Sequence, residues 1–162
     1  MMRLIYASLL LAMLFTSVWA EGTQVAFGTI RQDTSQPVEV TSDTLTVDQN
    51  TGEALFTGNV LIGQGEMRLS APRVLVIYQE GNTGIERLEA TGGVTLVSGQ
   101  DAAEAERADY NVVNGVIVMT GDVLLDQGLN ALSAARMEVN LETGTAQMSG
   151  RVRTILQSGG NN

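Results

Sequence analysis

The sequence predicts an all-β protein, a twisted antiparallel β-jelly roll of stacked, bent hairpins whose arms make two facing sheets. Three observations support this fold class. A hydroxyl residue and a glycine recur shortly before a valine, glycine-rich turns fall between the recurrences, and the segments between turns alternate apolar with polar residues. A signature that returns at such a period indicates one supersecondary unit stacked on copies of itself. With about four short strands in each unit, we expect roughly 14 to 16 strands.

The recurring signature begins with Thr or Ser at positions that are 34, 29 and 29 residues apart. A glycine inside a strand pattern usually marks a bend or a bulge. We therefore predict a corner at each recurrence, where a strand leaves one sheet for the other. The four recurrences are Thr57-Gly58-Asn59-Val60, Thr91-Gly92-Gly93-Val94, Thr120-Gly121-Asp122-Val123 and Ser149-Gly150-Arg151-Val152.

Turn signals separate the predicted strands. Asn-Gly and Gly-X pairs supply the positive φ that tight hairpins need. A parallel β-helix, which also repeats at tens of residues per coil, is the alternative architecture, but regularly placed reversals favour hairpins. The turns fall at 50–52, 82–84, 114–115 and 143–144 on one side, and at 63–65, 98–99 and 127–128 on the other.

The segments between turns have the period of a strand. Residues 66–70 alternate apolar with polar side chains, and residues 73–78 are rich in β-branched types. The inward positions are almost all slim aliphatic residues, which describes either an ordinary narrow core or an incompletely filled groove that takes acyl chains. We expect the following side chains to point inward: Val38, Val40, Leu45, Val47, Val60, Ile62, Met67, Leu69, Val74, Val76, Leu88, Val94, Leu96, Tyr110, Val112, Val116, Val118, Val123, Leu125, Met137, Val139 and Met148.

The start of the chain is a separate segment. Arg3 precedes an apolar run that ends in Val18-Trp19-Ala20, a small-x-small cleavage pattern, so residues 1–20 are predicted to be a signal peptide. The alternative is an uncleaved membrane anchor, but about 15 apolar residues are fewer than the ~20 that a span needs. We expect residues 21–34 to be a flexible N-terminal segment, residues 35–157 to form one domain, and residues 158–162 to be a disordered tail.

The composition excludes most catalytic chemistry. The chain has no histidine and no cysteine, and its nine basic residues are all arginine. Catalytic triads, thiolate or imidazole metal sites and lysine Schiff bases each lack a necessary member, so we expect neither an enzyme nor a cofactor. The acidic residues Asp101, Glu104, Glu106 and Asp109 could bind calcium or act as an acid/base pair, but their alternation with alanines favours a solvated strand. A net charge of −9 makes nucleic acid a poor partner.

Several segments in order resemble the OstA-like (LptA-type) domain family of periplasmic lipopolysaccharide transport proteins. They are Gln36-Pro37-Val38-Glu39-Val40-Thr41-Ser42-Asp43, Phe56-Thr57-Gly58-Asn59-Val60, Gln64-Gly65, Arg73-Val74-Leu75-Val76, Asp109-Tyr110-Asn111-Val112 and Met119-Thr120-Gly121-Asp122-Val123. The similarity covers roughly residues 35–157. It implies a V-shaped jelly roll, open at both ends, that carries the lipid A part of lipopolysaccharide in its interior and stacks head to tail in the periplasm.

The resemblance also implies partners and contact residues. In this family the N-terminal edge meets an LptC-like inner-membrane protein, and the C-terminal edge meets an LptD-like outer-membrane translocon. By their places in the matching motifs, five residues are the best candidates for acyl contact, with plain core packing as the alternative for each. They are Val38, Val40, Leu96, Tyr110 and Val112.

Two other functions stay open at this point. One is an exported structural or adhesive β-stack with a filled core that binds no lipid. The other is an LptC-like anchored paralogue, which requires the first segment to stay uncleaved. Bound lipid distinguishes the first of these alternatives from a carrier, and the mature N-terminus distinguishes the second.

Overall fold

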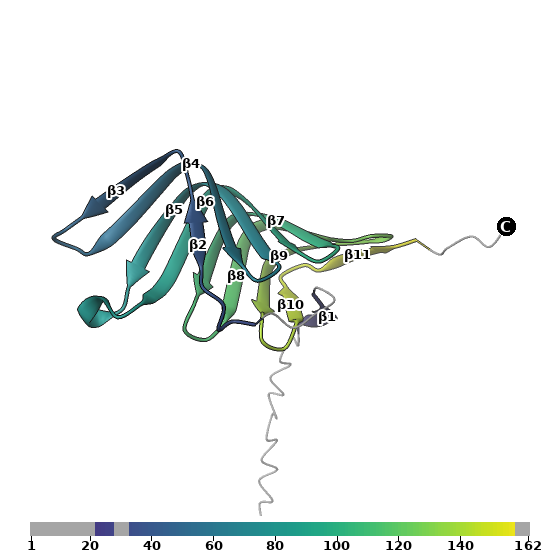
Figure 1. Cartoon of the computed structure of the whole chain (residues 1–162). Helices are drawn as coiled ribbons and strands as arrows, with labels where there is room; N and C mark the ends of the chain where they lie inside the picture. The colour runs from purple at the N-terminus through teal and green to yellow at the C-terminus, as the bar shows by residue number, and fades with distance from the viewer. Residues whose placement is uncertain (1–21, 28–32, 158–162) are drawn as a thin grey trace, which may run out of the picture.

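The structure is a computed structural model that describes residues 22–27 and 33–157, and all of its described strands belong to one antiparallel sheet (Figure 1). A short 3₁₀ helix, η1 (Glu80–Asn82), joins the fifth strand to the sixth. The strands are β1 (Thr23–Ala26), β2 (Glu39–Thr41), β3 (Thr44–Asp48), β4 (Glu53–Gln64), β5 (Met67–Tyr78), β6 (Ile85–Ser98), β7 (Asp101–Asn111), β8 (Val116–Gln127), β9 (Asn130–Asn140), β10 (Thr145–Ser149) and β11 (Arg153–Leu156).

The order of the strands follows the chain except at its start. Strands β4 to β10 are neighbours in sequence order, β2 and β3 both pair with β4, and β10 and β11 both pair with β9. Strand β1 lies far from β2, because it pairs with β10 at the other end of the sheet. Consecutive antiparallel pairing is what short hairpin turns produce.

Each long strand bends at a corner. In β5 the buried side chains are Met67, Leu69 and Ala71 before the bend and Val74 and Val76 after it, so the inward face changes parity there. The register against β4 skips two residues, Gly58 and Asn59, while β5 skips one. A bulge of this kind bends the strand and re-aims its side chains without breaking the ladder on either side.

The recurring Thr/Ser-Gly signature forms these corners. At all four recurrences the glycine and the residue after it have positive φ, for example Gly121 at 85° and Asp122 at 45°. Three of the corners coincide with register shifts, and at the fourth the carbonyl of Gly150 accepts a hydrogen bond of 2.9 Å from the backbone N–H of Ala135. Two successive left-handed residues turn the chain sharply, which is why a glycine is required first.

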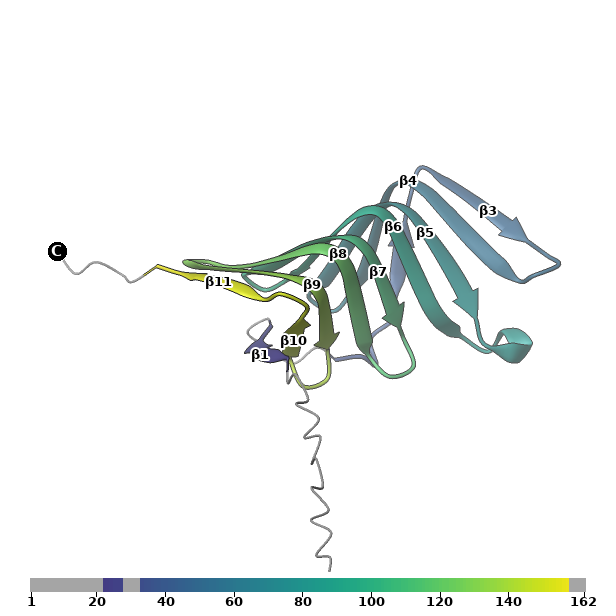
Figure 2. The same cartoon turned by 180° about the vertical axis from the view of Figure 1, so that it is seen from behind.

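The corners fold the sheet into two facing arms (Figures 1 and 2). The β2 arm contains β2, β11 and the parts of β4 to β9 that end at the tight turns near Gly65, Gly99 and Gly128. The β3 arm contains β3, β10, β1 and the parts of β4 to β9 that end at the turns 79–84, 113–115 and 142–144. The buried apolar side chains lie on the inner faces of both arms and form one cluster.

The predicted all-β jelly-roll class is confirmed, and the strand count differs. The described residues form eleven strands instead of the expected 14 to 16, and the two facing layers are the two arms of one continuous sheet. The reason is that each strand stays extended through its bulge and resumes the same ladder on the far side. A strand such as β6, with 14 residues, therefore crosses the corner as one element instead of two.

The N-terminal segment contains structure within the stretch 21–34 that the sequence predicts to be flexible. Thr23–Ala26 form β1, and the next residue, Phe27, is buried at 2% exposure. The predicted signal peptide 1–20 and the predicted tail 158–162 lie outside the described residues. Over the described ranges, no helix is long and apolar enough to cross a membrane.

Candidate functional site

The space between the two arms is the candidate site, and it is lined throughout by apolar side chains. Every long strand contributes alternate residues from both sides of its corner, and these side chains are nearly inaccessible to solvent. The β3 arm contributes Ala54, Val74, Val76, Leu88, Ala90, Ala108, Tyr110, Ile117, Met119, Met137, Val139, Ala146 and Met148, and the β2 arm contributes Val60, Ile62, Met67, Leu69, Ala71, Val94, Leu96, Ala103, Ala105, Val123, Leu125, Leu132 and Ala134. In this state the arms are closed on each other.

The N-terminal end of this interior is open. Leu45 and Val47 of β3 are 52% and 57% exposed, although their register partners Phe56 and Ala54 are inward-facing residues of β4. Directly opposed residues of an antiparallel pair share a face. Leu45 and Val47 therefore face the interior and are exposed because β3 is the last described strand at this edge of the arm.

The tips of the arms, opposite the corners, are held together by a buried glutamine. Gln64, at the tip of the β2 arm, accepts a hydrogen bond through Oε1 from the hydroxyl of Tyr110 in the β3 arm. Its Nε2 donates to the backbone carbonyls of Thr34 and Gln36, both at 2.9 Å. A buried amide must be satisfied in this way, because an unpaired polar group would cost about 1–3 kcal/mol.

Tyr110 is kept neutral by its surroundings. Burial, only partly offset by the hydrogen bond with Gln64, raises the pKa of Tyr110 from 10.0 to about 12. The hydroxyl therefore remains a hydrogen-bond donor over the whole physiological pH range. Changes of pH within that range therefore leave the bond between Tyr110 and Gln64 intact.

A second polar link ties the arms together at the C-terminal end. Gln127, at the tip of the β2 arm, donates through Nε2 to the carbonyl of Ala26 at 2.6 Å and to the carboxylate of Asp101 at 3.1 Å. The next residue, Phe27, donates its backbone N–H to the carbonyl of Gly144 at 3.0 Å. The buried Phe27 ring thus lies at the C-terminal end of the interior, where β1 pairs with β10.

All five predicted contact residues belong to this interior, but at different depths. Leu96 in the β2 arm and Tyr110 in the β3 arm are fully buried, whereas Val38, Val40 and Val112 are half-buried and pack against the core. Val38 and Val40 lie at the open N-terminal end, because Val40 of β2 pairs with Ile62 of β4. The structure therefore does not gather the five into one pocket but distributes them along the interior.

Three functional candidates are absent from the predicted set. Gln64 links the tips of the two arms, and Phe27 is buried at the C-terminal end of the interior. Phe56 packs against the core near the open N-terminal end. Phe56 stands one residue before a Thr-Gly corner and Gln64 lies in the matching segment Gln64-Gly65, whereas Phe27 had no local signal. Gln64 is 46 residues from Tyr110 in the chain, and no local pattern indicates that contact.

The outer face carries the charges. Arg107 forms a two-pronged hydrogen bond with Asp109, at 2.9 and 2.8 Å, and an ion pair with Glu89 at 3.2 Å, and these acidic neighbours raise its pKa. Of the acidic group that the sequence singled out, Asp109 is thus engaged by an arginine and Glu104 is solvent-exposed. In the described ranges no three acidic side chains are gathered closely enough to hold a metal ion.

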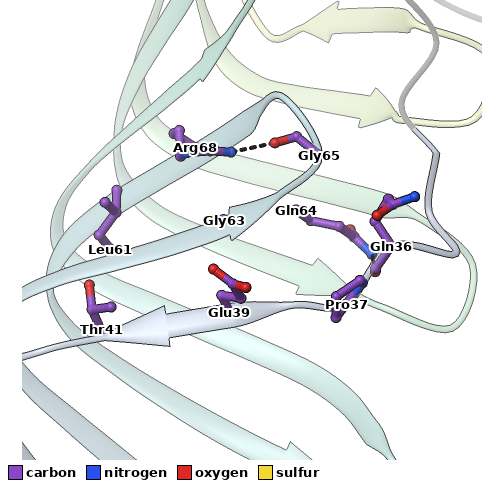
Figure 3. A pocket seen from close by; sticks show the side chains of 9 residues that line it. All are labelled: Gln36, Pro37, Glu39, Thr41, Leu61, Gly63, Gln64, Gly65 and Arg68. Carbon is purple, nitrogen blue, oxygen red and sulfur yellow. Dashed lines mark hydrogen bonds between the residues drawn. The ribbon is translucent and has the colours of Figure 1, made fainter.

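A polar pocket of about 280 Å³ lies outside the interior, at the N-terminal edge of the β2 arm (Figure 3). Glu39 of β2 stands opposite Gly63 of β4, and Arg68 of β5 stands opposite Gly63 on the other side. The Arg68 guanidinium donates to the carbonyls of Gly65 and Met67 at 2.6 and 2.7 Å. A strand added beside β2 would have Glu39 and Arg68 of this pocket on its outer face and the apolar side chain of Val40 on its inner face.

One antiparallel sheet folded along a line of corners over an apolar lining defines the chain as an open β-jelly roll. Within the described residues, β2 and β3 at one end and β1 and β11 at the other are each paired on one side only. The chain belongs to the LptA/(LptD N-terminal domain) LPS transport protein family, whose sequence model matches residues 39–145.

Individual relatives are similar to the chain over part of its length. The chain is 31% identical over 115 residues to the uncharacterized protein R00383 of Rhizobium meliloti (strain 1021), covering 67% of this chain and 62% of the relative. It is 30% identical over 94 residues to the lipopolysaccharide export system protein LptA of Escherichia coli K12, covering 54% of this chain and 51% of that protein. The chain thus spans between half and two thirds of the length of these relatives.

The fold has a solved counterpart. The crystal structure of LptH, the LptA homologous periplasmic component of the lipopolysaccharide transport device of Pseudomonas aeruginosa, superposes with a TM-score of 0.69. The superposition covers 78% of this chain and 99% of LptH, at 17% sequence identity. The jelly-roll architecture is therefore shared although most side chains differ.

Proposed function

We propose that this chain is a periplasmic carrier that holds the acyl chains of lipopolysaccharide between its two arms and stacks head to tail to bridge the inner and outer membranes. An LptC-like protein would join the N-terminal edge, and an LptD-like translocon would join the C-terminal edge. The observation that carries the proposal is the continuous apolar lining, which reaches an open end at Leu45 and Val47. Membership of a lipopolysaccharide transport family supports the cargo.

The energetics favour a continuous interior over free diffusion of lipid. Hiding one methylene from water contributes about 0.8 kcal/mol, so releasing several acyl chains into water would cost tens of kcal/mol. Transfer between two identical apolar linings costs almost nothing by comparison. The carrier then needs no catalytic group, and direction has to be supplied from outside the stack.

Loading requires the arms to separate, since the lining is closed by its own side chains. The corner bulges are the natural pivots, and the links from Gln64 and Gln127 at the tips are the contacts that opening would break. The apolar surface exposed by opening would be covered by acyl chains. Few polar links therefore oppose opening, and the bound acyl chains would cover again the apolar area that opening exposes.

The sharpest test substitutes the open end while sparing the fold. Leu45→Asp places a charge on the inward face of β3, at a side chain that is already 52% exposed, so the protein should fold. We expect a loss of at least about tenfold in lipopolysaccharide recovered with the purified protein, because a carboxylate in an acyl path is strongly disfavoured. Lipid extraction and mass spectrometry measure the amount.

The matched control is Leu61→Asp, on the neighbouring strand β4 and facing outward. Leu61 is 42% exposed, so the two substitutions add the same charge at similar exposure on opposite faces. Leu61→Asp should retain its lipid. Equal lipid content in both variants would contradict the proposal, as would a folded Val40→Asp or Leu96→Asp protein that still purifies with lipid.

One observation favours a second candidate, an exported β-stack that carries no lipid. The lining is nearly inaccessible to solvent in the described residues, as a filled core would be. This alternative predicts that wild-type protein purified from an envelope contains no more lipid than the Leu45→Asp variant. The same extraction therefore decides between the two functions.

A further inference from the structure

The two arms have unequal numbers of strands. Counted over the described strands, the β2 arm has eight (β2, β4 to β9, and β11) and the β3 arm has nine (β3, β4 to β9, β10, and β1). The extra strand is β1. A second copy that continued both arms would have to place its β2 beside β11 and its β3 beside β10, and β1 already occupies the second of these places.

Strand β1 occupies that place in the direction and register that an incoming β3 would take. Thr23 lies opposite Met148, and Val25 lies opposite Ala146. Followed across the ladder from strand to strand, the row of Met148 ends at Leu45 and the row of Ala146 ends at Val47. In a straight continuation, Leu45 of a second copy would replace Thr23, and Val47 would replace Val25.

The replacement would bury more apolar surface. In β1 the inward positions over Met148 and Ala146 are filled by a threonine and a half-buried valine. In β3 the same positions hold Leu45 and Val47, both more than half exposed in the single chain. A strand whose apolar side chains are uncovered is a template for pairing, and antiparallel addition to β10 would cover them.

We propose that β1 is a displaceable cap on the edge of β10, and that β3 of a second copy of this chain takes its place. The proposal rests on the head-to-tail stacking proposed above. In the free chain the cap protects Ala146 and Met148 and keeps Phe27 at the C-terminal end of the interior. Displacement withdraws Phe27 along with β1, so the interior of one copy becomes continuous with that of the next only after the joint has formed.

The test uses cysteine reporters, which the chain permits because it has no cysteine. Thr46 and Gln147 lie on one outward row, so Thr46→Cys in one copy and Gln147→Cys in another would face each other across a β3 to β10 joint. Thr41→Cys and Arg153→Cys report the β2 to β11 joint in the same way. Thr46→Cys mixed with Leu124→Cys, outward but away from both edges, measures chance collisions.

Both reporter pairs should give disulfide-linked heterodimers on a non-reducing gel at least about fivefold above the collision control, since antiparallel neighbours lie within disulfide reach. A Thr41/Arg153 link without a Thr46/Gln147 link would mean that copies stack while β1 stays in place, which overturns the cap. Absence of both links would overturn the stacking itself. The amount of bound lipid is measured in a separate experiment, so neither gel result bears on whether the chain binds lipid.

A lock supplies the converse experiment. Gln24 and Gln147 are opposed on the outer face, so Gln24→Cys/Gln147→Cys in one chain would fasten β1 to β10 when oxidised. We expect the oxidised protein to self-associate at least about tenfold more weakly than the reduced protein in sedimentation, because only the β2 arm can join. The control lock Ser70→Cys/Thr95→Cys, between β5 and β6, should be insensitive to reductant. Equal association of the oxidised and reduced β1 lock would overturn the proposal.

Discussion

Gln64 connects three separate parts of the chain with one side chain. Its amide group is bonded to Tyr110 in the opposite arm and to the backbone of Thr34 and Gln36, which precede β2. All of its polar atoms are thereby satisfied at a site that is 3% exposed. The consequence is that any separation of the tips near the N-terminal end must first break the bond between Gln64 and Tyr110.

Tyr110→Phe removes one of these bonds while keeping the ring. We expect the free energy of unfolding to fall by about 1–3 kcal/mol, because the buried Oε1 of Gln64 loses its donor. Urea denaturation measures the change, with Gln64→Leu and the double variant completing a cycle. The double variant should be less destabilised than the sum of the single variants, and simple additivity would argue against a direct bond.

The raised pKa of Tyr110 predicts a loss of stability at high pH. Because the folded pKa, about 12, exceeds the ordinary 10.0, the stability contribution is complete below pH 10 and is lost as the pH rises from 10 through 12. The unfolded chain releases the phenol proton in this window while the folded chain retains it. Unfolding free energies at pH 9 and pH 11.5 should differ more for wild type than for Tyr110→Phe, and equal losses would refute the assignment.

The corners are the elements that give the molecule its shape. They share a backbone conformation although their residues differ. The residue after the corner glycine is Asn59, Gly93, Asp122 or Arg151, yet all four have positive φ. The glycine itself is constrained by the adjacent strand. A Cβ on Gly92 would lie 2.6 Å from Cγ of Pro72, whereas a Cβ on Gly93 would meet nothing within 4 Å.

These two adjacent glycines allow strain and steric clash to be separated. Gly93→Ala should cost about 1–2 kcal/mol of unfolding free energy, the penalty for a side chain in the left-handed region. Gly92→Ala carries the same strain and also clashes with Pro72, so it should cost a further ~1–3 kcal/mol. Urea denaturation of both variants checks the order, and equal costs would mean that the Pro72 ring moves aside freely.

The corners could be predicted from sequence because their signal is local. Which side chains of β8 point inward could not be predicted in this way. Val116 and Val118 were expected to point inward, but Ile117 and Met119 are the buried residues of β8. The stretch Val116-Ile117-Val118-Met119 is apolar throughout, so the alternation of apolar and polar residues cannot show which of its side chains face inward. Register with β7, which places Val118 beside the outward Asp109, decides the matter.

Strand β1 was not predictable for a different reason. Thr23–Ala26 is four residues long and pairs with residues 145–148 at the opposite end of the chain. Neither its composition nor its length distinguishes it from a linker. The apolar interior could likewise be predicted from alternation, but its closure by Gln64, Gln127 and Phe27 depends on contacts between the arms that no local pattern carries.

At the scale of the whole molecule, the proposed stack joins acidic copies: the full chain carries a formal charge of −9, and loss of Arg3 with the predicted signal peptide would make each copy more negative. Like charges oppose assembly at low ionic strength, where the screening length is about 30 Å, and much less at 0.15 M salt, where it is about 8 Å. We expect the weight-average mass at a fixed protein concentration to rise with salt over this range in light scattering. Leu45→Asp, with a damaged edge, should show little rise, and a mass that falls with salt would indicate joints held mainly by ion pairs.

The connection between β5 and β6 explains why one repeat of the corner signature is 34 residues long and the others are 29. The additional residues lie in the turn that contains η1, at the tip of the β3 arm, and the corner bulges on either side keep their register. Length is therefore free at a hairpin tip and fixed at a corner. A short epitope inserted at Gly81, in a hairpin tip that belongs to neither joining edge, would label every copy while leaving the stack intact, so that the number of copies in a bridge could be counted.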